Sequence, residues 1–235
     1  MEINIAVAKI DKFGVGTSGD TVEVIERPNG GISVVLADGE VSGESQKTIS
    51  TMVAHQVIDH ISRGIRDGAS IRAASNLIYT EHLGKIRSDL NVISVDMQTN
   101  TILISRNSAV PVFLIDDEKV DCLATESTPI GFQEDISPTI VELSIRPSMA
   151  VIALSDGVYH AGRKYQQNAD IRTTLEALIE GQDLYAQEIA DFLLSRSIRL
   201  DDSHPKDDMS VVVLMVSLES KDPIRRMNVS FTIDA

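Results

Sequence analysis

Apolar and polar residues alternate along many short segments of this chain, which is the pattern of β-strands. In residues 3–10, the apolar residues Ile3, Ile5 and Val7 occupy every second position and so lie on one face of a strand. The turn residues of segment 28–31 (PNGG) separate two further apolar runs, as in a hairpin. By this pattern we predict strands over residues 3–10, 21–26, 32–37, 91–97, 101–105, 110–115, 139–145, 149–154, 209–218 and 227–233.

Elsewhere apolar residues recur every three or four positions, which is the period of an amphipathic helix. Ile49, Val53, Val57 and Ile61 are each four residues apart and so line one helix face. The predicted helices come in two pairs: residues 44–66 (with Ser42 as candidate N-cap) and 70–86, then residues 169–180 and 186–199.

The order of these elements indicates the fold class. Because the helices come in pairs between groups of strands, and not singly between successive strands, a doubly wound parallel sheet is disfavoured. We therefore expect an α+β protein, a four-layer α-β-β-α sandwich of two antiparallel sheets flanked by helix pairs. No low-complexity linker or internal repeat divides the chain, so residues 1–235 are predicted to form a single domain.

Composition and charge restrict the classes of partner. The chain has 21 Lys and Arg against 35 Asp and Glu, a formal net charge of -14, which argues against nucleic acid and anionic membranes. Cys122 is the sole cysteine, which fits a reducing compartment. Because no signal peptide is visible and no apolar run approaches the ~18 residues of a membrane span, we expect a cytoplasmic protein. We also expect a monomer.

Acidic residues stand at the ends of four predicted strands. Asp20 precedes one strand and Asp38-Gly39 follows the next, Asp156-Gly157 repeats that pattern, and Asp207-Asp208 precedes the strand 209–218. A single Asp-Gly pair after a strand is usually a turn, but carboxylates at strand ends also supply the oxygen ligands that Mg²⁺ and Mn²⁺ prefer. Four such acidic positions favour a two-metal centre, which would activate water and neutralise a phosphoryl group.

The motifs SGD, LADG, LSDG and DDMSVVV, in this order, resemble those of the metal-dependent serine/threonine phosphatases of the PP2C type. The most similar branch is the bacterial SpoIIE-like one, because the segment 106–113 (RNSAVPVF) and the turn 128–131 (TPIG) are similar to two weaker motifs of that branch. The resemblance covers roughly residues 3–218 and implies the same α-β-β-α sandwich that the element order predicts.

The resemblance also implies a ligand set for two Mn²⁺ or Mg²⁺ ions: Asp20, Asp38, Gly39, Asp156 and Asp207. Asp38 would bridge both ions, whose shared water attacks the phosphorus, and the carbonyl of Gly39 would bind one ion. Asp208 either supports the ligands without touching a metal or is the alternative to Asp207. No substrate-binding residue is indicated.

Two positions depart from the family pattern. Eukaryotic members have a histidine after the Asp-Gly pair, where this chain has Glu40, so the proton donor to the leaving group stays open: a metal-bound water, His160 and His204 are the candidates. The phosphate-binding arginine of eukaryotic members has no clear counterpart, and Lys9 and Lys12 are candidates for its role.

The activity implied by the resemblance is hydrolysis of phosphoserine or phosphothreonine in a phosphorylated protein. Small members of this branch resemble the phosphatases that reset bacterial stress-signalling complexes (stressosomes) and partner-switching modules, which implies STAS-domain proteins as substrates. Two alternatives stay open: a catalytically inactive signalling or binding module on the same fold, and a hydrolase of small phosphoesters. The retained acids argue against the inactive module, which has no need for like charges at one edge.

Overall fold

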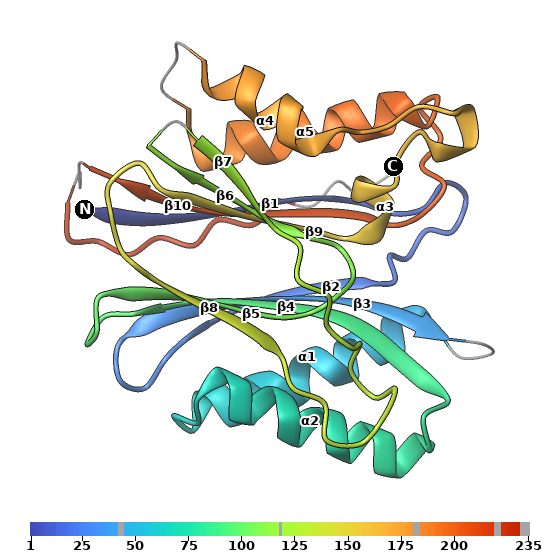
Figure 1. Cartoon of the computed structure of the whole chain (residues 1–235), viewed down its shortest axis with the longest axis vertical. Helices are drawn as coiled ribbons and strands as arrows, with labels where there is room; N and C mark the ends of the chain where they lie inside the picture. Colours follow the sequence, from blue (N-terminus) through green and yellow to red (C-terminus); the bar gives the residue numbers. More distant parts are fainter. Residues whose placement is uncertain (42–44, 118, 181–183, 219–221, 231–235) are drawn as a thin grey trace.

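Two five-stranded antiparallel sheets face each other, and helices cover the outer face of each (Figure 1). The computed structural model describes residues 1–41, 45–117, 119–180, 184–218 and 222–230. One sheet has the order β1 (Glu2–Ile10), β10 (Met209–Ser217), β9 (Ala150–Leu154), β6 (Val112–Asp116) and β7 (Lys119–Leu123). The other has the order β2 (Asp20–Glu26), β3 (Gly31–Val41), β4 (Ile86–Asp96), β5 (Thr101–Asn107) and β8 (Thr139–Ser144).

The helices form the two outer layers. The β2–β8 sheet is covered by α1 (Gln46–Ser62) and α2 (Asp67–His82), and the β1–β7 sheet by α4 (Ile171–Ile179) and α5 (Ala186–Leu200) (Figure 1). A short helix, α3 (Asp156–Tyr159), follows β9 directly, and a 3-10 turn follows over Arg163–Tyr165. This arrangement confirms the predicted α+β fold class and its α-β-β-α layers.

The central strands are apolar on both faces because each sheet has a core on each side. Val34 and Leu36 of β3 belong to the core between the two sheets. Their neighbours Val35 and Ala37 face the other way and pack with Ile49, in the core beneath α1 and α2. A third core lies between the other sheet and α4 and α5.

Several element boundaries differ from those predicted. Helix α2 ends at His82, not Ile86, because Leu83 and Gly84 adopt left-handed backbone conformations that terminate it. Ile86 instead begins β4, which pairs with the full length of β3. The first helix begins at Gln46, and the predicted start at Glu44 and cap at Ser42 lie outside the described residues.

Three elements were not predicted, namely β7, α3 and the 3-10 helix Arg163–Tyr165, and one prediction was wrong. The edge strand β7 buries mainly Val120, so its apolar alternation is too weak to detect, and α3 spans only four residues. The strand expected over residues 227–233 is absent at 227–230, which pair with no strand, and residues 231–233 lie outside the described residues. None of the described helices is both long and apolar enough to cross a membrane.

Candidate metal centre

Three carboxylates lie side by side across neighbouring strands of the second sheet. Asp20 of β2 is the register partner of Asp38 in β3, and Asp38 is the partner of Asp89 in β4. Cross-strand partners point to the same face of a sheet. That face turns toward the other sheet, since Leu36 and Ile93 of the same strands lie in the core between the sheets.

The opposite sheet contributes a fourth acid. Asp156 follows β9 and begins α3, and its carboxyl group is within hydrogen-bonding reach of the Asp38 carboxyl. Asp38, Asp89 and Asp156 line one narrow cavity between the sheets. The other residues that line it are Leu36, Asn91, Ser108, Val110, Leu154 and Ser155.

Neither Asp-Gly pair is a turn. Asp38 and Gly39 lie inside β3, which continues to Val41 and not, as predicted, only to Ala37. A Cβ at Gly39 would overlap the carbonyl oxygen of Gln46, at the start of α1. A Cβ at Gly157 would likewise overlap the carbonyl oxygen of Asp208. Both Asp-Gly pairs therefore mark places where another segment passes too close to the glycine for a side chain.

Asp20 is a fully buried carboxylate, and one of its two oxygens has no hydrogen-bond donor among the described residues. Its Oδ2 accepts a hydrogen bond of 2.6 Å from the Ser210 hydroxyl, whereas its Oδ1 has no partner among the described residues. The ammonium groups of Lys9 and Lys47 both donate to its backbone carbonyl oxygen, at 2.6 and 2.8 Å. A buried carboxylate oxygen without a donor is unfavourable, and it is a suitable partner for a cation or its bound water.

Burial and mutual repulsion disfavour the charged form of these acids. Burial, followed by the negative charges of Asp20, Asp156 and Asp89, raises the pKa of Asp38 well above its usual range. Burial, and then the charge of Asp207, raises the pKa of Asp156 to about 6. Burial likewise raises the pKa values of Asp20 and Asp89. A divalent cation among the acids would reverse this, because it favours their ionised forms.

The raised pKa of Asp156 predicts how the metal-free protein responds to pH. Between the unfolded value of 3.8 and the folded value of about 6, the folded chain holds more protons, so the free energy of unfolding falls as pH rises. Asp156 is partly exposed, so we expect only about 1 kcal/mol from it, or ~2–4 °C in Tm between pH 4.5 and 7 in EDTA. Thermal unfolding at several pH values measures it, and Asp156→Asn should reduce the slope, to which Asp20, Asp38 and Asp89 also contribute. An unchanged slope in that variant would exclude Asp156 as a source.

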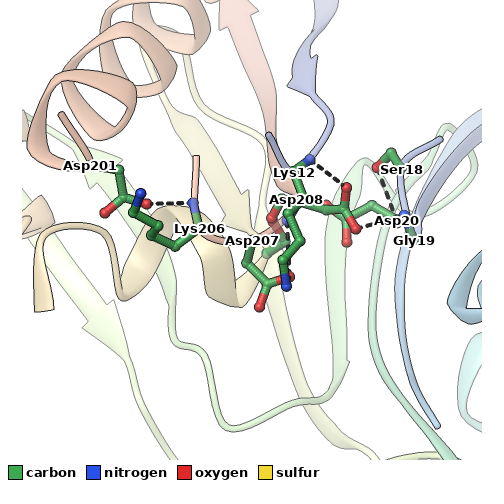
Figure 2. Close-up of polar contacts among 9 residues, drawn as sticks. Lys12, Ser18, Gly19, Asp20, Asp201, Lys206, Asp207 and Asp208 are labelled. Carbon is green, nitrogen blue, oxygen red and sulfur yellow. Dashed lines mark hydrogen bonds and ion pairs between the residues drawn. The ribbon is translucent and has the colours of Figure 1, made fainter. Parts of the chain in front are cut away.

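Asp207 and Asp208 have different surroundings. The carboxylate of Asp208 is buried and accepts the backbone N–H groups of Lys12 and Gly19, at 2.9 and 2.8 Å (Figure 2). The side chain of Asp207 is 44% exposed and lies 3.8 Å from the Lys12 ammonium. Both oxygens of Asp208 are thus committed to the backbone of the loop that leads into β2, whereas Asp207 is open to solvent beside Asp156.

Asp89 is the acid of this cavity that sequence reasoning missed. It accepts a hydrogen bond of 2.6 Å from the hydroxyl of Ser108. The predicted strand began at residue 91, so position 89 appeared to be in a helix-to-strand connection. Only the pairing of β4 with β3 places it next to Asp38, and no local motif signals that pairing.

The other sequence candidates lie around the centre with different contacts. Lys9 is held by the carbonyl of Asp20, and Lys12 by Asp207. His204 is exposed, its ring packing against Phe13, and His160 follows α3 with an Nδ1 that is buried and has no partner among the described residues. Neither histidine lines the cavity between the sheets.

The donor set fits hard divalent cations. Within the described part of the chain, no group of three or more His, Cys, Asp or Glu side chains is arranged so that it could hold a metal ion. Mg²⁺ does not require such a group, because it is usually held by one or two carboxylates and keeps several waters. The open oxygen of Asp20 and the repulsion among Asp38, Asp89 and Asp156 are what such cations would relieve.

Comparison with known sequences identifies relatives over nearly the whole chain. The family model described as Stage II sporulation protein E (SpoIIE) matches residues 28–217. Stage II sporulation protein E from Priestia megaterium is 26% identical over 211 residues, which is 90% of this chain and 36% of that protein. The chain thus spans little more than a third of the length of this curated relative.

Solved structures share the fold at low sequence identity. The PP2C phosphatase domain with a fragment of the regulatory domain of SpoIIE from Bacillus subtilis has a TM-score of 0.78 and 23% identity, covering 92% of this chain and 64% of that one. The catalytic domain of the serine/threonine protein phosphatase PstP, in complex with two manganese ions, has a TM-score of 0.72 and 17% identity, covering 92% of this chain and 98% of that one. These likenesses show the PP2C fold.

Proposed function

Because the chain belongs to the SpoIIE (Stage II sporulation protein E) family, we propose that it is a metal-dependent phosphatase of phosphoserine and phosphothreonine in proteins. The observation that carries this proposal is that Asp20 and Asp156, from two separate sequence motifs, both lie close enough to Asp38 of a third motif to act on its charge. The complex of the PstP catalytic domain with two manganese ions supports a divalent cation as cofactor.

We assign the ligands as follows. Asp38 lies between Asp20 and Asp89 in the sheet and faces Asp156, so it is best placed to contact two cations. Asp156 and Asp207 would hold one of them, and Asp20 and the Gly39 carbonyl would support the other. Asp208 is assigned the structural role of fixing the loop before β2, because its oxygens are already bonded to backbone N–H groups.

In this proposal two bound Mn²⁺ or Mg²⁺ ions would supply the Lewis acidity that activates water and offsets the charge of the phosphoryl group. The chain's own residues hold and orient the acidic side chains. The hydroxyl of Ser210 donates to one oxygen of Asp20, and the hydroxyl of Ser108 donates to one oxygen of Asp89, which orients both carboxylates. The backbone at Gly39 packs closely against the start of α1, and the backbone at Gly157 packs closely against Asp208. These contacts limit the motion of the neighbouring Asp38 and Asp156.

An inactive module is less well supported. Four acids whose pKa values are all raised by burial destabilise the metal-free fold at neutral pH. A binding module could replace them with neutral side chains at no loss. By family and architecture we propose bacterial stress-signalling or partner-switching proteins of the STAS type as substrates, and a cytoplasmic location.

Removal of the metal tests the proposed activity. Purified protein should hydrolyse a phosphoserine peptide and a generic aryl phosphate with Mn²⁺ or Mg²⁺, and EDTA should lower both rates at least ~100-fold, since cations contribute several kcal/mol to the transition state. Turnover of the aryl phosphate without the peptide would favour the small-phosphoester hydrolase. Cation binding without turnover of either substrate, or no cation binding at all, would contradict the proposal.

A further inference from the structure

Beside the candidate metal centre, three loops are joined into one rigid platform, which we define as residues 11–19, 160–166 and 201–208. Asp208 accepts the backbone N–H groups of Lys12 and Gly19, and Asp201 accepts that of Lys206 (Figure 2). Asp201 also accepts the backbone N–H of Gly162, at 2.9 Å. Both carboxylates are buried, at 5% and 3% exposure. Charge-assisted hydrogen bonds to backbone N–H groups are among the strongest in proteins, so the platform is held in one conformation.

Large apolar side chains point from this platform into solvent. Phe13 is 65% exposed and Val15 is 56% exposed. The ring centroids of Phe13 and His204 lie 4.5 Å apart in a T-shaped arrangement. The backbone N–H of Phe13 donates to the carbonyl of Pro205, so both the backbone and the ring of Phe13 are held by residues 204 and 205. The Tyr165 ring is also partly exposed and lies 5.9 Å from the ammonium of Lys206.

The platform also departs from the charge of the whole chain. Acidic residues outnumber basic ones by 35 to 21 overall. Within the platform four side chains are basic: Lys12, Arg163, Lys164 and Lys206. It also holds five acidic residues, of which Asp201 and Asp208 are buried and Asp11, Asp202 and Asp207 are not. The surface of the platform thus carries four basic against three acidic side chains, which favours acidic partners over basic ones.

We propose that this platform is a docking surface for the phosphorylated protein substrate, and that it selects acidic residues flanking the phosphoserine or phosphothreonine. This inference rests on the proposed phosphatase function. Asp207 belongs to the platform and faces Asp156, so a phosphoresidue at the metal centre places its flanking residues over the platform. Phe13 and Val15 offer rigid apolar contacts of the kind that dominate interfaces, and Arg163, Lys164 and Lys206 supply the charge selection.

Two matched phosphoserine peptides test this, one with glutamate and one with lysine at the flanking positions, each with one apolar flanking residue. Binding to the Mn²⁺-loaded protein is measured by fluorescence anisotropy, which does not require turnover. We expect the acidic peptide to bind about tenfold more tightly, since electrostatic selection of this size corresponds to a modest coupling. The preference should shrink in 0.5 M salt, where exposed charges are screened.

Variants localise the effect. Lys164→Glu should lower the Kd ratio of the two peptides from about ten toward one, and Phe13→Ala should weaken both peptides three- to tenfold. Lys119→Glu, an exposed lysine on β7 at the opposite edge of the sheet, is the matched control and should retain the preference. Equal binding of the two peptides, or loss of the preference in the control alone, would overturn the docking surface.

Parallel measurements separate this inference from the proposed function. Hydrolysis of the aryl phosphate, which has no flanking residues, reports on the metal centre alone. If the aryl phosphate is not hydrolysed, the proposed phosphatase function is contradicted, but peptide binding still tests the docking surface. Gel filtration of wild type and Phe13→Ala identifies the competing occupant. A dimer that becomes a monomer in Phe13→Ala, with peptide binding unchanged, would assign the platform to self-association and overturn substrate docking.

Discussion

Asp38→Asn is expected to abolish hydrolysis of phosphoserine peptides, lowering kcat by at least about 10³-fold, or ~4 kcal/mol, while the protein stays folded. The reason is position: Asp38 is flanked by Asp20 and Asp89 within the sheet and faced by Asp156 from the other sheet. An amide cannot offer the second anionic oxygen that a residue contacting two cations needs. Steady-state kinetics, together with calorimetric titration of Mn²⁺, measures both losses.

The same variant has a second expected effect, on stability. Because burial and three neighbouring acids raise the pKa of Asp38, its ionised form opposes folding at pH 7 when no cation is present. We expect metal-free Asp38→Asn to unfold at a Tm at least ~2–4 °C above that of the wild type, corresponding to about 1 kcal/mol. The matched control is Asp121→Asn, an exposed aspartate on β7, which should change neither rate nor Tm. Wild-type turnover in Asp38→Asn would remove the bridging assignment.

Substitution of the two adjacent aspartates should affect different properties, Mn²⁺ binding in one case and stability in the other. Asp207→Asn is expected to weaken Mn²⁺ binding at least tenfold with little change in Tm, because its side chain is 44% exposed, its ion pair to Lys12 is long, and the amide oxygen of Asn can still accept the backbone N–H of Asp208. Asp208→Asn should instead lower the free energy of unfolding by about 1–3 kcal/mol, since one of the two backbone N–H groups, the buried one of Gly19 or the partly buried one of Lys12, loses its acceptor.

Each of these two variants serves as the control for the other, because the chemical change is identical. Thermal unfolding in EDTA measures the structural effect, and calorimetric titration of Mn²⁺ measures the effect on the centre. If Asp208→Asn loses cation affinity at unchanged metal-free Tm, the assignment is reversed and Asp208 is the ligand. Figure 2 shows why we expect otherwise, as Asp208 faces the loop at Gly19 and Asp207 lies away from it.

Some parts of the fold were predictable because they depend on local periodicity. The alternation at Ile3, Ile5 and Val7 and the four-residue spacing from Ile49 to Ile61 reflect which faces are buried, and both elements occur, although the helix ends at Ser62 and not at Arg66 as predicted. Where local signal is weak, prediction was wrong or missed the element. The apolar residues after Met227 suggested a strand, but the described part of that segment pairs with none, and β7 lacked a clear pattern.

The candidate site divides in the same way. By itself, the sequence determined the layer order and the four acidic motifs, since each is a short run of residues. Only the tertiary structure decided that Asp89 stands beside Asp38, that Gly39 is required by the approach of α1, and that Asp208 is an anchor while Asp207 is open. The physical reason is that strand register and the approach of distant segments arise from packing between parts of the chain far apart in sequence, which no local pattern encodes.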